Sequence, residues 1–502
     1  MRNIFFLLVF IFVQATALAQ STPFQNKFSS IEKYIDTLMK EWNIPGMAVG
    51  IVYKDQLIFA KGFGHRDLEK KLPVDANTIF PIASNTKLFT ATIAAMLQVE
   101  GRLNVDVPVK TYMPSLNFST PQLNSEVTLR DMLSHRTGLP RYDAIWVASQ
   151  MSRSETVSKV AYMQPSLGFR QGYIYNNMMF AAAGAVMEKV TDQTWENLIR
   201  SKILLPLGMQ STCFTNEDMK AEGNFASSYF QADSTGKLSL MEFSGQSIAL
   251  GPAGTLKSNL TDMSKWMIAQ LNEGKYNGQQ VIPAEAIRMT LVPNSIVDRE
   301  GRWPELSNSL YGLGRNIQTY KGYKIAMHTG SIDGFYSNLT FVPSEKIALF
   351  VVHNGMPGGS IRSMMALPII DRLLSLTPTP WSKRYREDYL TALKDEKKFK
   401  DSVSKTRIEG TTPSHQLKDY AGNYSNPIYD DFVIEFNNNQ LHINYRGLQY
   451  LLYHFHYDQF VTKNETNGEP DFRLSFLTGA NGKIDRFSIS LFGDPISEFV
   501  KK

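Results

Sequence analysis

The order of hydrophobic patterns along the chain is the feature that most limits the folds open to it. Two β-rich runs, Gly46–Tyr53 and Gln56–Phe63, flank Lys54-Asp55 and predict a hairpin. Segments of helical spacing follow at 84–99, 177–190 and 260–271, and β-rich runs return at 324–327, 336–342 and 347–353. Strands on both sides of a helical middle indicate an α+β fold in which chain-distant strands share one sheet.

The two ends of this body have patterns of their own. Apolar residues recur at helical spacing from Ile31 to Trp42, so we expect a helix there with Ser29 and Ser30 as N-caps. Near residue 377 the composition shifts to Pro-Thr-Pro and then to a charged run, Lys383–Lys405. This shift predicts a linker or bridging helix over residues 377–412.

Alternating apolar residues predict a small β domain at the C-terminal end. Phe432–Phe436 and the alternating Leu441, Ile443 and Tyr445 form a hairpin pattern, and further strands are expected at 472–477 and 487–492. We therefore expect a main body over residues 20–376, the linker over 377–412 and this domain over 413–502.

The first nineteen residues have the pattern of a signal peptide. Arg2 supplies positive charge, residues 4–13 are apolar, and Ala17-Leu18-Ala19 is a small-x-small cleavage site. The apolar core of about ten residues is shorter than the roughly 20 that a bilayer span needs, and no later stretch is long enough. We expect a periplasmic or secreted protein with no integral membrane span after cleavage.

Charge, cysteine and histidine content narrow the classes of partner. The formal net charge is +5 without a Lys/Arg block, which gives no support for a nucleic-acid partner. Cys213 is the only cysteine, so no intrachain disulfide forms and a buried inert thiol is expected. His454 and His456 lack a third ligand, so we expect no metal site. His135 is expected to hold a loop by hydrogen bonds.

The search for a reactive serine favours a Ser-x-x-Lys device. The Gly-x-Ser-x-Gly elbow is absent, since the nearest match, at 245–249, lacks the final glycine. In Ser-x-x-Lys, a serine near a helix start has a lysine one turn later on the same face, so the amine takes the hydroxyl proton. The pattern occurs four times, at Ser30/Lys33, Ser84/Lys87, Ser234/Lys237 and Ser402/Lys405.

The surroundings of the four pairs single out Ser84. The other three pairs lie on a surface helix, in a turn and in the charged linker, where a lysine keeps its usual pKa of about 10.4. Ser84 follows the apolar run Thr78–Ala83 and opens the apolar helix Lys87–Met96. Burial there lowers the pKa of Lys87 and makes its amine usable as a base.

Two further elements accompany this pair. Tyr175-Asn176-Asn177 precedes a small-residue helix, so its phenol can relay protons and its amide can hold both Lys87 and a substrate carbonyl. His328-Thr329-Gly330-Ser331 follows a strand-like run, where glycine permits close approach of a substrate backbone and a main-chain N–H faces an oxyanion.

The three elements, in this order, resemble the serine hydrolase family that includes class C β-lactamases, D-alanyl-D-alanine carboxypeptidases and related esterases and D-aminopeptidases. The stretches at 133–139, 205–209 and 251–256 are similar to that family too. The resemblance implies a β-lactamase/transpeptidase-like antiparallel sheet flanked by helices, beside a helical domain, with the site between them and no cofactor. The C-terminal domain resembles the lipocalin-like, small β-barrel-like domain of many relatives.

The resemblance also implies catalytic roles. Ser84 is the acylated nucleophile, Lys87 its activating partner, and Tyr175 the proton shuttle to the leaving group. Asn177 orients the acyl-side amide. Whether Lys87 or Tyr175 is the general base stays open at this point.

The same resemblance implies the substrate-binding residues. Thr329 and Gly330 are among these substrate-binding residues, and the backbone N–H groups of Ser84 and Ser331 form the oxyanion hole. His328 stands where β-lactamases use lysine, which favours the carboxypeptidase and esterase branches. If its pKa is near 6.5, activity changes between about pH 5.5 and 7.5. Arg315, just before the same strand, is expected to pair with a substrate carboxylate.

These interpretations leave several functions open. The leading one is an exported serine acyl-transfer hydrolase acting on peptide-like amides such as D-alanyl peptides. A carboxylesterase is the nearest alternative. A penicillin-binding or sensor protein that acylates once without turnover, or a carrier that holds an apolar ligand in its terminal β domain, belongs to a different class. The substrate is a small molecule or a peptide, and the sequence does not determine the oligomeric state.

Overall fold

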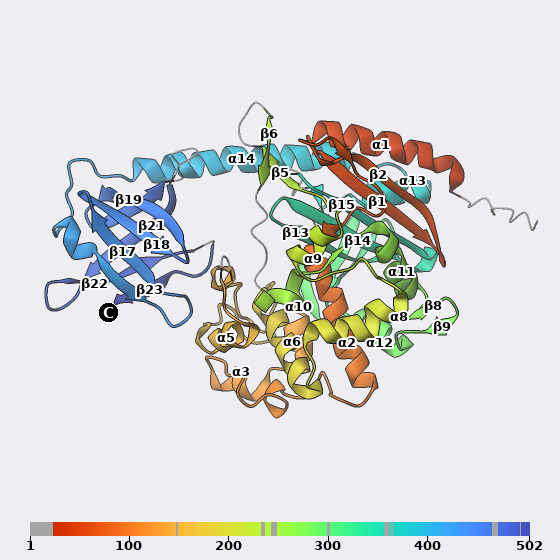
Figure 1. Ribbon diagram of the computed structural model, residues 1–502, viewed down its shortest axis with the longest axis horizontal. Coiled ribbons are helices and arrows are strands. Elements are labelled where there is room, and N and C mark those ends of the chain that lie inside the picture. Colours follow the sequence, from red (N-terminus) through yellow and green to blue (C-terminus); the bar gives the residue numbers. More distant parts are fainter. Residues whose placement is uncertain are drawn as a thin grey trace, which may run out of the picture.

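The computed structural model describes residues 24–146, 149–231, 236–241, 248–298, 302–355, 361–362, 365–463, 470–491 and 493–502. The expected signal peptide over residues 1–19 and the Ser234 position therefore lie outside the described residues. The chain forms a main body, built from residues 24–373, and a closed barrel connected to it by a long helix (Figure 1).

The main body is built on a nine-stranded antiparallel sheet. Its strands, in spatial order, are β10 (Ser295–Asp298), β11 (Leu306–Tyr311), β12 (Asn316–Tyr320), β13 (Tyr323–Ile332), β14 (Phe335–Val342), β15 (Ile347–His353), β1 (Gly46–Tyr53), β2 (Gln56–Asp67) and β3 (Leu72–Pro73). β1 pairs with β15, with Met47 opposite His353, so the N-terminal hairpin joins strands that lie 300 residues later. The expectation that chain-distant strands share one sheet is confirmed.

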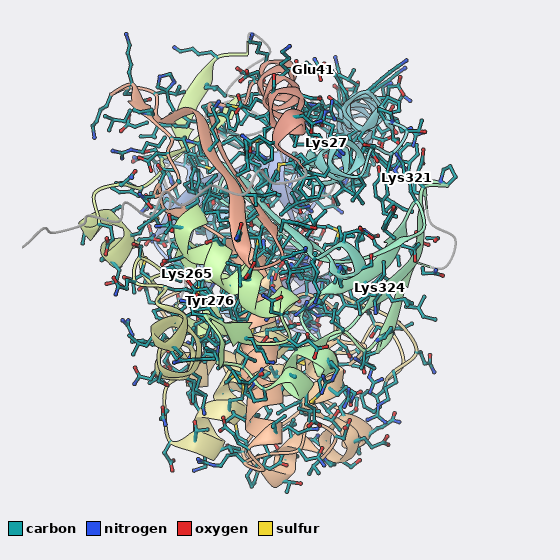
Figure 2. The ribbon with its side chains drawn as sticks, turned by 90° about the vertical axis from the view of Figure 1, so that its right-hand side faces the viewer. Lys27, Glu41, Lys265, Tyr276, Lys321 and Lys324 are labelled. Carbon is teal, nitrogen blue, oxygen red and sulfur yellow. The ribbon has the colours of Figure 1, made fainter. Side chains whose placement is uncertain are left out.

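Helices cover both faces of this sheet, which is why β1, β14 and β15 are buried along nearly their whole length. One face carries α1 (Phe28–Glu41) and α13 (Leu367–Leu373). Lys27 and Lys321 both reach α13 (Figure 2): one Nζ donates to the Leu373 carbonyl at 2.6 Å and the other pairs with Asp371 at 2.7 Å.

The start of α1 differs from the sequence-based expectation. A 3₁₀ turn over Gln25–Lys27 runs directly into the helix, which begins at Phe28 and has no side-chain cap. Ser29 and Ser30 are therefore inside the helix and do not cap it. The backbone is already helical before them, so their hydroxyls meet no free N–H at a helix start.

The other face carries the helical part of the main body. Its helices are α2 (Thr86–Val99), α3 (Pro121–Glu126), α4 (Leu129–Leu133), α5 (Arg153–Ser158), α6 (Asn177–Thr191), α7 (Trp195–Ile199), α8 (Leu205–Leu207), α9 (Asn216–Ala221), α10 (Gly251–Gly254), α11 (Leu260–Leu271) and α12 (Ala284–Thr290). α2 and α6 are buried on nearly every side, as their apolar composition requires.

Short strand pairs complete the main body. They are β4 (Phe80–Pro81) with β7 (Lys257–Ser258), β5 (Ser228–Gln231) with β6 (Leu238–Met241), and β8 (Lys275–Tyr276) with β9 (Gln279–Gln280). No helix of the described residues is long and apolar enough to cross a membrane.

The charged run after residue 377 forms α14 (Trp381–Lys405), which leads from the main body to the barrel (Figure 1). The barrel strands are β16 (Gly422–Ser425), β17 (Phe432–Asn437), β18 (Gln440–Tyr445), β19 (Leu448–His456), β20 (Gln459–Lys463), β21 (Pro470–Thr478), β22 (Ile484–Ile489) and β23 (Ser497–Lys501).

Aromatic side chains fill the barrel interior. Phe432 stacks on Tyr445 and makes an edge contact with Phe487, which in turn stacks on Phe499. A cavity of about 20 Å³ remains beside them, which is room for about one water molecule. This cavity is too small for the apolar ligand that a carrier would hold.

Candidate active site

Ser84 lies in a 3₁₀ turn, η2 (Ala83–Asn85), immediately before α2. Ala83 has a positive φ of 48°, a left-handed conformation that non-glycine residues adopt at a cost and that clusters at functional sites. The turn is held by the sheet: Ser337 Oγ donates to the Ile82 carbonyl at 2.7 Å, and a Cβ at Gly330 would lie 2.3 Å from that same oxygen. The Ser84 turn therefore leaves no room for a side chain at position 330, and this requirement for Gly330 holds even without a substrate.

Lys87 follows Ser84 by one turn and is fully buried. Its Nζ lies 3.1 Å from Ser84 Oγ, 2.8 Å from Asn177 Oδ1 and 2.6 Å from the Ala253 carbonyl oxygen. Burial, with a smaller contribution from the Arg141 guanidinium, holds the pKa of Lys87 well below its usual value. The lysine that the sequence singled out is therefore poised to be a neutral amine.

The partners of Nζ decide where the lone pair of a neutral amine points. The Asn177 amide oxygen and the Ala253 carbonyl only accept, so both take an N–H from Lys87. A neutral amine has two N–H groups, and its lone pair is then left for Ser84, whose hydroxyl can donate. This arrangement is the one that a general base beside a nucleophile would need.

Tyr175 completes the contacts of Ser84. Its hydroxyl donates to Ser84 Oγ at 2.8 Å, and burial raises the pKa of Tyr175 to about 12. The phenol is therefore protonated at neutral pH. His135 fixes the segment: its Nδ1 accepts the Asn176 N–H at 3.1 Å, and its ring centroid lies 4.4 Å from that of Tyr175. His135 makes the loop-holding hydrogen bonds expected of it.

Two residues beside the site carry no sequence motif and were missed. Asp143 Oδ1 accepts from Asn177 Nδ2 at 3.0 Å, and its Oδ2 accepts from Arg141 Nε at 2.5 Å. The Arg141 guanidinium lies 5.0 Å from the centre of the Tyr175 ring. Both residues belong to the 141–146 loop, and only the folded chain brings this loop to Asn177.

A family model described as Beta-lactamase matches residues 31–372, more than half of the chain. The chain belongs to the beta-lactamase family. A second model, described as a domain of unknown function (DUF3471), matches residues 406–499, which include the barrel strands.

Curated relatives of this chain have moderate sequence identity to it. The chain is 28% identical over 434 residues to the unguisins hydrolase ungD' of Aspergillus campestris, covering 82% of this chain and 78% of that protein. It is 27% identical over 330 residues to protein flp of Staphylococcus aureus, covering 64% of this chain and 62% of that protein. The match therefore spans less than two thirds of protein flp.

Solved structures share the fold of this beta-lactamase family member. The octameric penicillin-binding protein homologue from Pyrococcus abyssi has a TM-score of 0.63 at 21% identity, covering 94% of this chain and 100% of that one. SurE with D-Leu has a TM-score of 0.56 at 17% identity, covering 95% and 100%. These likenesses include the barrel as well as the main body, and they concern the fold alone.

The third motif lies on β13, next to the Ser84 turn. His328 is buried, its Nδ1 is 2.7 Å from the Thr329 carbonyl, and its Nε2 is 3.0 Å from the Tyr311 hydroxyl. A carbonyl only accepts, so Nδ1 carries the proton and Nε2 accepts from Tyr311. Burial, followed by the nearby Lys87, lowers the pKa of His328 to about 3. Ser331 is exposed on the same strand.

This geometry corrects the expected titration of His328. With a pKa of about 3 the imidazole stays neutral above about pH 4, so it carries no charge change between pH 5.5 and 7.5. We expect the ratio of acylation rates of wild type and His328→Gln to be constant over that window. The measurement is the rate of Ser84 labelling at several pH values. A step in this ratio near pH 6.5 would contradict the neutral assignment.

Arg315 is enclosed in the core, which argues against its expected role as a carboxylate receptor. Its side chain is 2% exposed, donates to Gln270 on α11, and lies with its guanidinium 5.5 Å from the centre of the Phe341 ring. A guanidinium enclosed in this way is not open to a substrate carboxylate in this conformation. The sequence pattern placed Arg315 close to the strand that carries His328, but it did not reveal which way the Arg315 side chain points.

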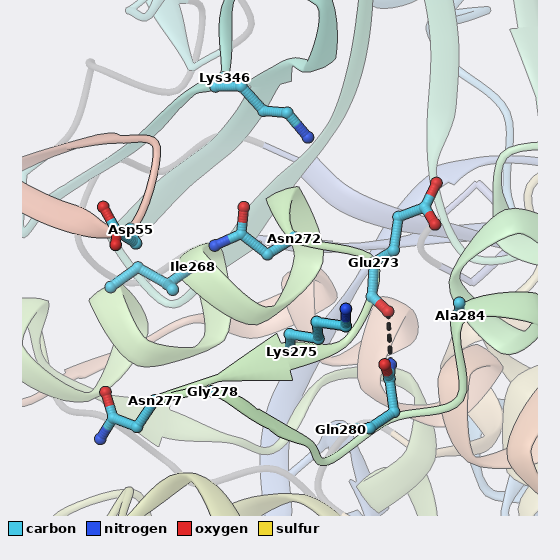
Figure 3. A pocket seen from close by; sticks show the side chains of 10 residues that line it. All are labelled: Asp55, Ile268, Asn272, Glu273, Lys275, Asn277, Gly278, Gln280, Ala284 and Lys346. Carbon is cyan, nitrogen blue, oxygen red and sulfur yellow. Dashed lines mark hydrogen bonds between the residues drawn. The ribbon is translucent and has the colours of Figure 1, made fainter.

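No group of three or more His, Cys, Asp or Glu within the described ranges is placed to hold a metal ion. A polar hollow of about 640 Å³ lies elsewhere, between the end of α11, the β8–β9 turn and Lys346 (Figure 3). It shares no lining residue with the Ser84 site. Its shape alone identifies no ligand.

Proposed function

We propose that the chain is an exported serine hydrolase that forms an acyl-enzyme on Ser84 and cleaves peptide-like amides, D-alanyl peptides among them. The observation that carries the proposal is the array around one hydroxyl: a lysine amine at 3.1 Å and a protonated phenol at 2.8 Å. The name of the unguisins hydrolase supports a hydrolytic reaction, and the D-Leu in a SurE structure of this fold is the reason for choosing substrates with D-residues. The signal-like residues 1–19 support export.

The hydrogen bonds suggest an order of proton transfers. Ser84 gives its proton to Lys87 while Oγ bonds to the substrate carbonyl carbon, and the carbonyl oxygen becomes an oxyanion. The N–H groups of Ser84 and Ser331 are our candidates for holding that oxyanion. Tyr175 then gives its phenol proton to the leaving nitrogen as the C–N bond breaks. The Lys87 ammonium restores the proton to Tyr175, and water hydrolyses the acyl-enzyme.

In this scheme Lys87 is the base and Tyr175 the acid. The assignment follows from the two pKa directions, since a buried amine is readily neutral and a buried phenol is readily protonated. The reverse assignment would need a phenolate beside an ammonium, and burial disfavours both charges.

Arg141, in place of Arg315, is our candidate for binding a substrate carboxylate. The Arg141 side chain is 51% exposed, and its charge lowers the pKa of Tyr175, the proposed donor to the leaving nitrogen. A carboxylate on the leaving residue would lie beside this guanidinium. We therefore expect peptides with a free C-terminal carboxylate to be preferred over their amides.

The experiment compares kcat/KM for D-alanyl-D-alanine peptides and for their C-terminal amides. The acid is expected to be favoured by about five- to tenfold, the low end for a charged hydrogen bond, because Arg141 is half-exposed. Arg141→Gln is expected to erase the preference. Arg302→Gln, which removes a 62% exposed arginine paired with Asp388, is the matched control and should keep it.

Only the ratio of the two substrates is informative, because Arg141 also holds Asp143 and its loss can slow both reactions. Equal rates on acid and amide in the wild type would reject carboxylate recognition. Rapid hydrolysis of aryl esters with no amide cleavage would favour the carboxylesterase. A penicillin adduct on Ser84 that does not decay would favour a non-turnover protein.

A further inference from the structure

A residue of the barrel, Asp494, contacts the main body close to the Ser84 site. Asp494 lies between β22 and β23, is 4% exposed, and accepts the N–H groups of Asp143 at 2.8 Å and Ala144 at 2.9 Å. These N–H groups begin the 3₁₀ turn η4 (Asp143–Ile145). A carboxylate at a helical N-terminus usually comes from the same segment, whereas here it comes from residues about 350 positions later.

Other barrel residues hold the same turn. Arg446, whose side chain is 5% exposed, donates from Nη1 to the Ala144 carbonyl at 2.8 Å and pairs through Nε with Asp430 at 2.6 Å. Tyr429 donates to Asp494 Oδ2 at 3.2 Å. The N–H and the C=O of Ala144 are thus both bound by the barrel, which makes this a built contact with defined geometry.

The clamped turn is the one that orients Asn177. Tyr142, just before it, has a left-handed φ of 50°, a conformation that the local sequence does not favour. Asp143 follows and binds Asn177 Nδ2, and Asn177 Oδ1 in turn accepts from Lys87. A continuous series of hydrogen bonds therefore runs from Asp494 through Asp143 and Asn177 to the lysine beside Ser84.

We propose that the C-terminal barrel is a working part of the active site, in which Asp494 is a positioning residue that fixes the 141–146 loop and so holds Asn177 and Lys87 in their reactive geometry. The inference rests on the proposed function of Ser84. Burial raises the pKa of Asp494 to about 6, so the ionised carboxylate is kept there against a cost that the two N–H donors offset.

The test uses the full chain with Asp494→Ala and Asp494→Asn. Asp494→Ala removes both acceptors, and we expect kcat/KM on the D-alanyl substrate to fall about 10- to 100-fold, mainly through kcat, since small displacements of reactive groups cost this much. Asp494→Asn keeps one acceptor and should lie between wild type and Asp494→Ala. Hydrogen exchange at the Asp143 and Ala144 amides should accelerate in the same order.

Asp458→Ala is the matched control. Asp458 is a partly buried barrel carboxylate that accepts from the Ser414 N–H and hydroxyl and from Tyr420, all outside the main body. Its loss perturbs the barrel without touching the 141–146 loop, so kcat/KM is expected to stay at the wild-type value. A fall in Asp458→Ala equal to that in Asp494→Ala would overturn the inference, because it would mean that only barrel stability matters.

The remaining outcomes separate the inference from the function on which it rests. Wild-type kcat and amide exchange in both Asp494→Ala and Asp494→Asn, with Ser84 still acylated, would overturn the inference alone. If Asp494→Ala does not fold, Asp494→Asn decides: an intermediate kcat supports positioning and a wild-type kcat rejects it. A wild-type chain that no acylating reagent modifies at Ser84 would overturn the proposed function and this inference together.

Discussion

Ser84→Ala is expected to abolish covalent labelling of the chain by a fluorophosphonate and to lower kcat by at least about 10⁴-fold. The reason is that no other serine among the Ser-x-x-Lys pairs has a buried lysine. Ser30 and Ser402 are exposed on α1 and α14, where the following lysines are solvated. Intact mass after incubation measures the result, as one adduct on the wild type and none on the variant.

Ser30→Ala and Ser402→Ala serve as controls and should be labelled at the wild-type rate. Ser234→Ala, in a segment outside the described residues, is expected to behave in the same way. An adduct that persists in Ser84→Ala would remove Ser84 from its assigned role, and mapping of that adduct would identify the nucleophile.

Lys87→Met is expected to lower the acylation rate at neutral pH by about 10³-fold or more, because the serine loses its proton acceptor. Wild-type activity should fall as the pH drops, since protonation of Lys87 removes the base. The variant should lack this acidic limb. The measurement is the pH dependence of Ser84 labelling in both proteins.

Lys257→Met is the matched control. Lys257 is also buried, on β7, where it pairs with Pro81. Its Nζ donates to the Phe214 carbonyl, and burial lowers its pKa to about 8. We expect this variant to keep the wild-type rate and pH profile. Equal loss of activity in both variants would show that burying a lysine, rather than the base at Ser84, is what matters.

Lys87→Met also has an expected effect on the stability of the folded chain. The pKa of Lys87 is lower in the folded chain than its unfolded value of about 10.4, so the unfolded state binds more protons at neutral pH. The penalty that Lys87 alone adds to folding is therefore larger at pH 7 than at pH 10. Lys87→Met removes this penalty, so its Tm at pH 7 should exceed that of the wild type, with a difference that shrinks toward pH 10.4.

Local sequence patterns were sufficient for the long, buried elements. The strands Gly46–Tyr53 and Ile347–His353 and the helix Leu260–Leu271 begin and end at the expected residues. Their apolar residues are dense enough to define the period and the ends. By contrast, β10, β11 and β12 are half-exposed and polar, and no run marked them. β22 begins three residues earlier than expected, at Ile484.

The sequence by itself determined the pair at the centre of the site. Ser84 and Lys87 are three residues apart, so one helical turn brings them together in any fold that keeps this segment helical. The apolar residues around them also predicted the burial that depresses the lysine pKa. Distance and environment here both depend on neighbours in the chain, which a single sequence contains.

Only the tertiary structure decided what faces that pair. Asp143 reaches Asn177 across 34 residues and Asp494 reaches Asp143 across 351, through contacts that no local period encodes. Arg315 and His328 show the same limit, because a strand pattern does not reveal what covers each side chain. One is enclosed by α11 and the other is held neutral by burial beside Lys87. Periodicity fixes the face of an element, whereas solvation, charge and partners are set by whatever chain-distant segment packs against that face.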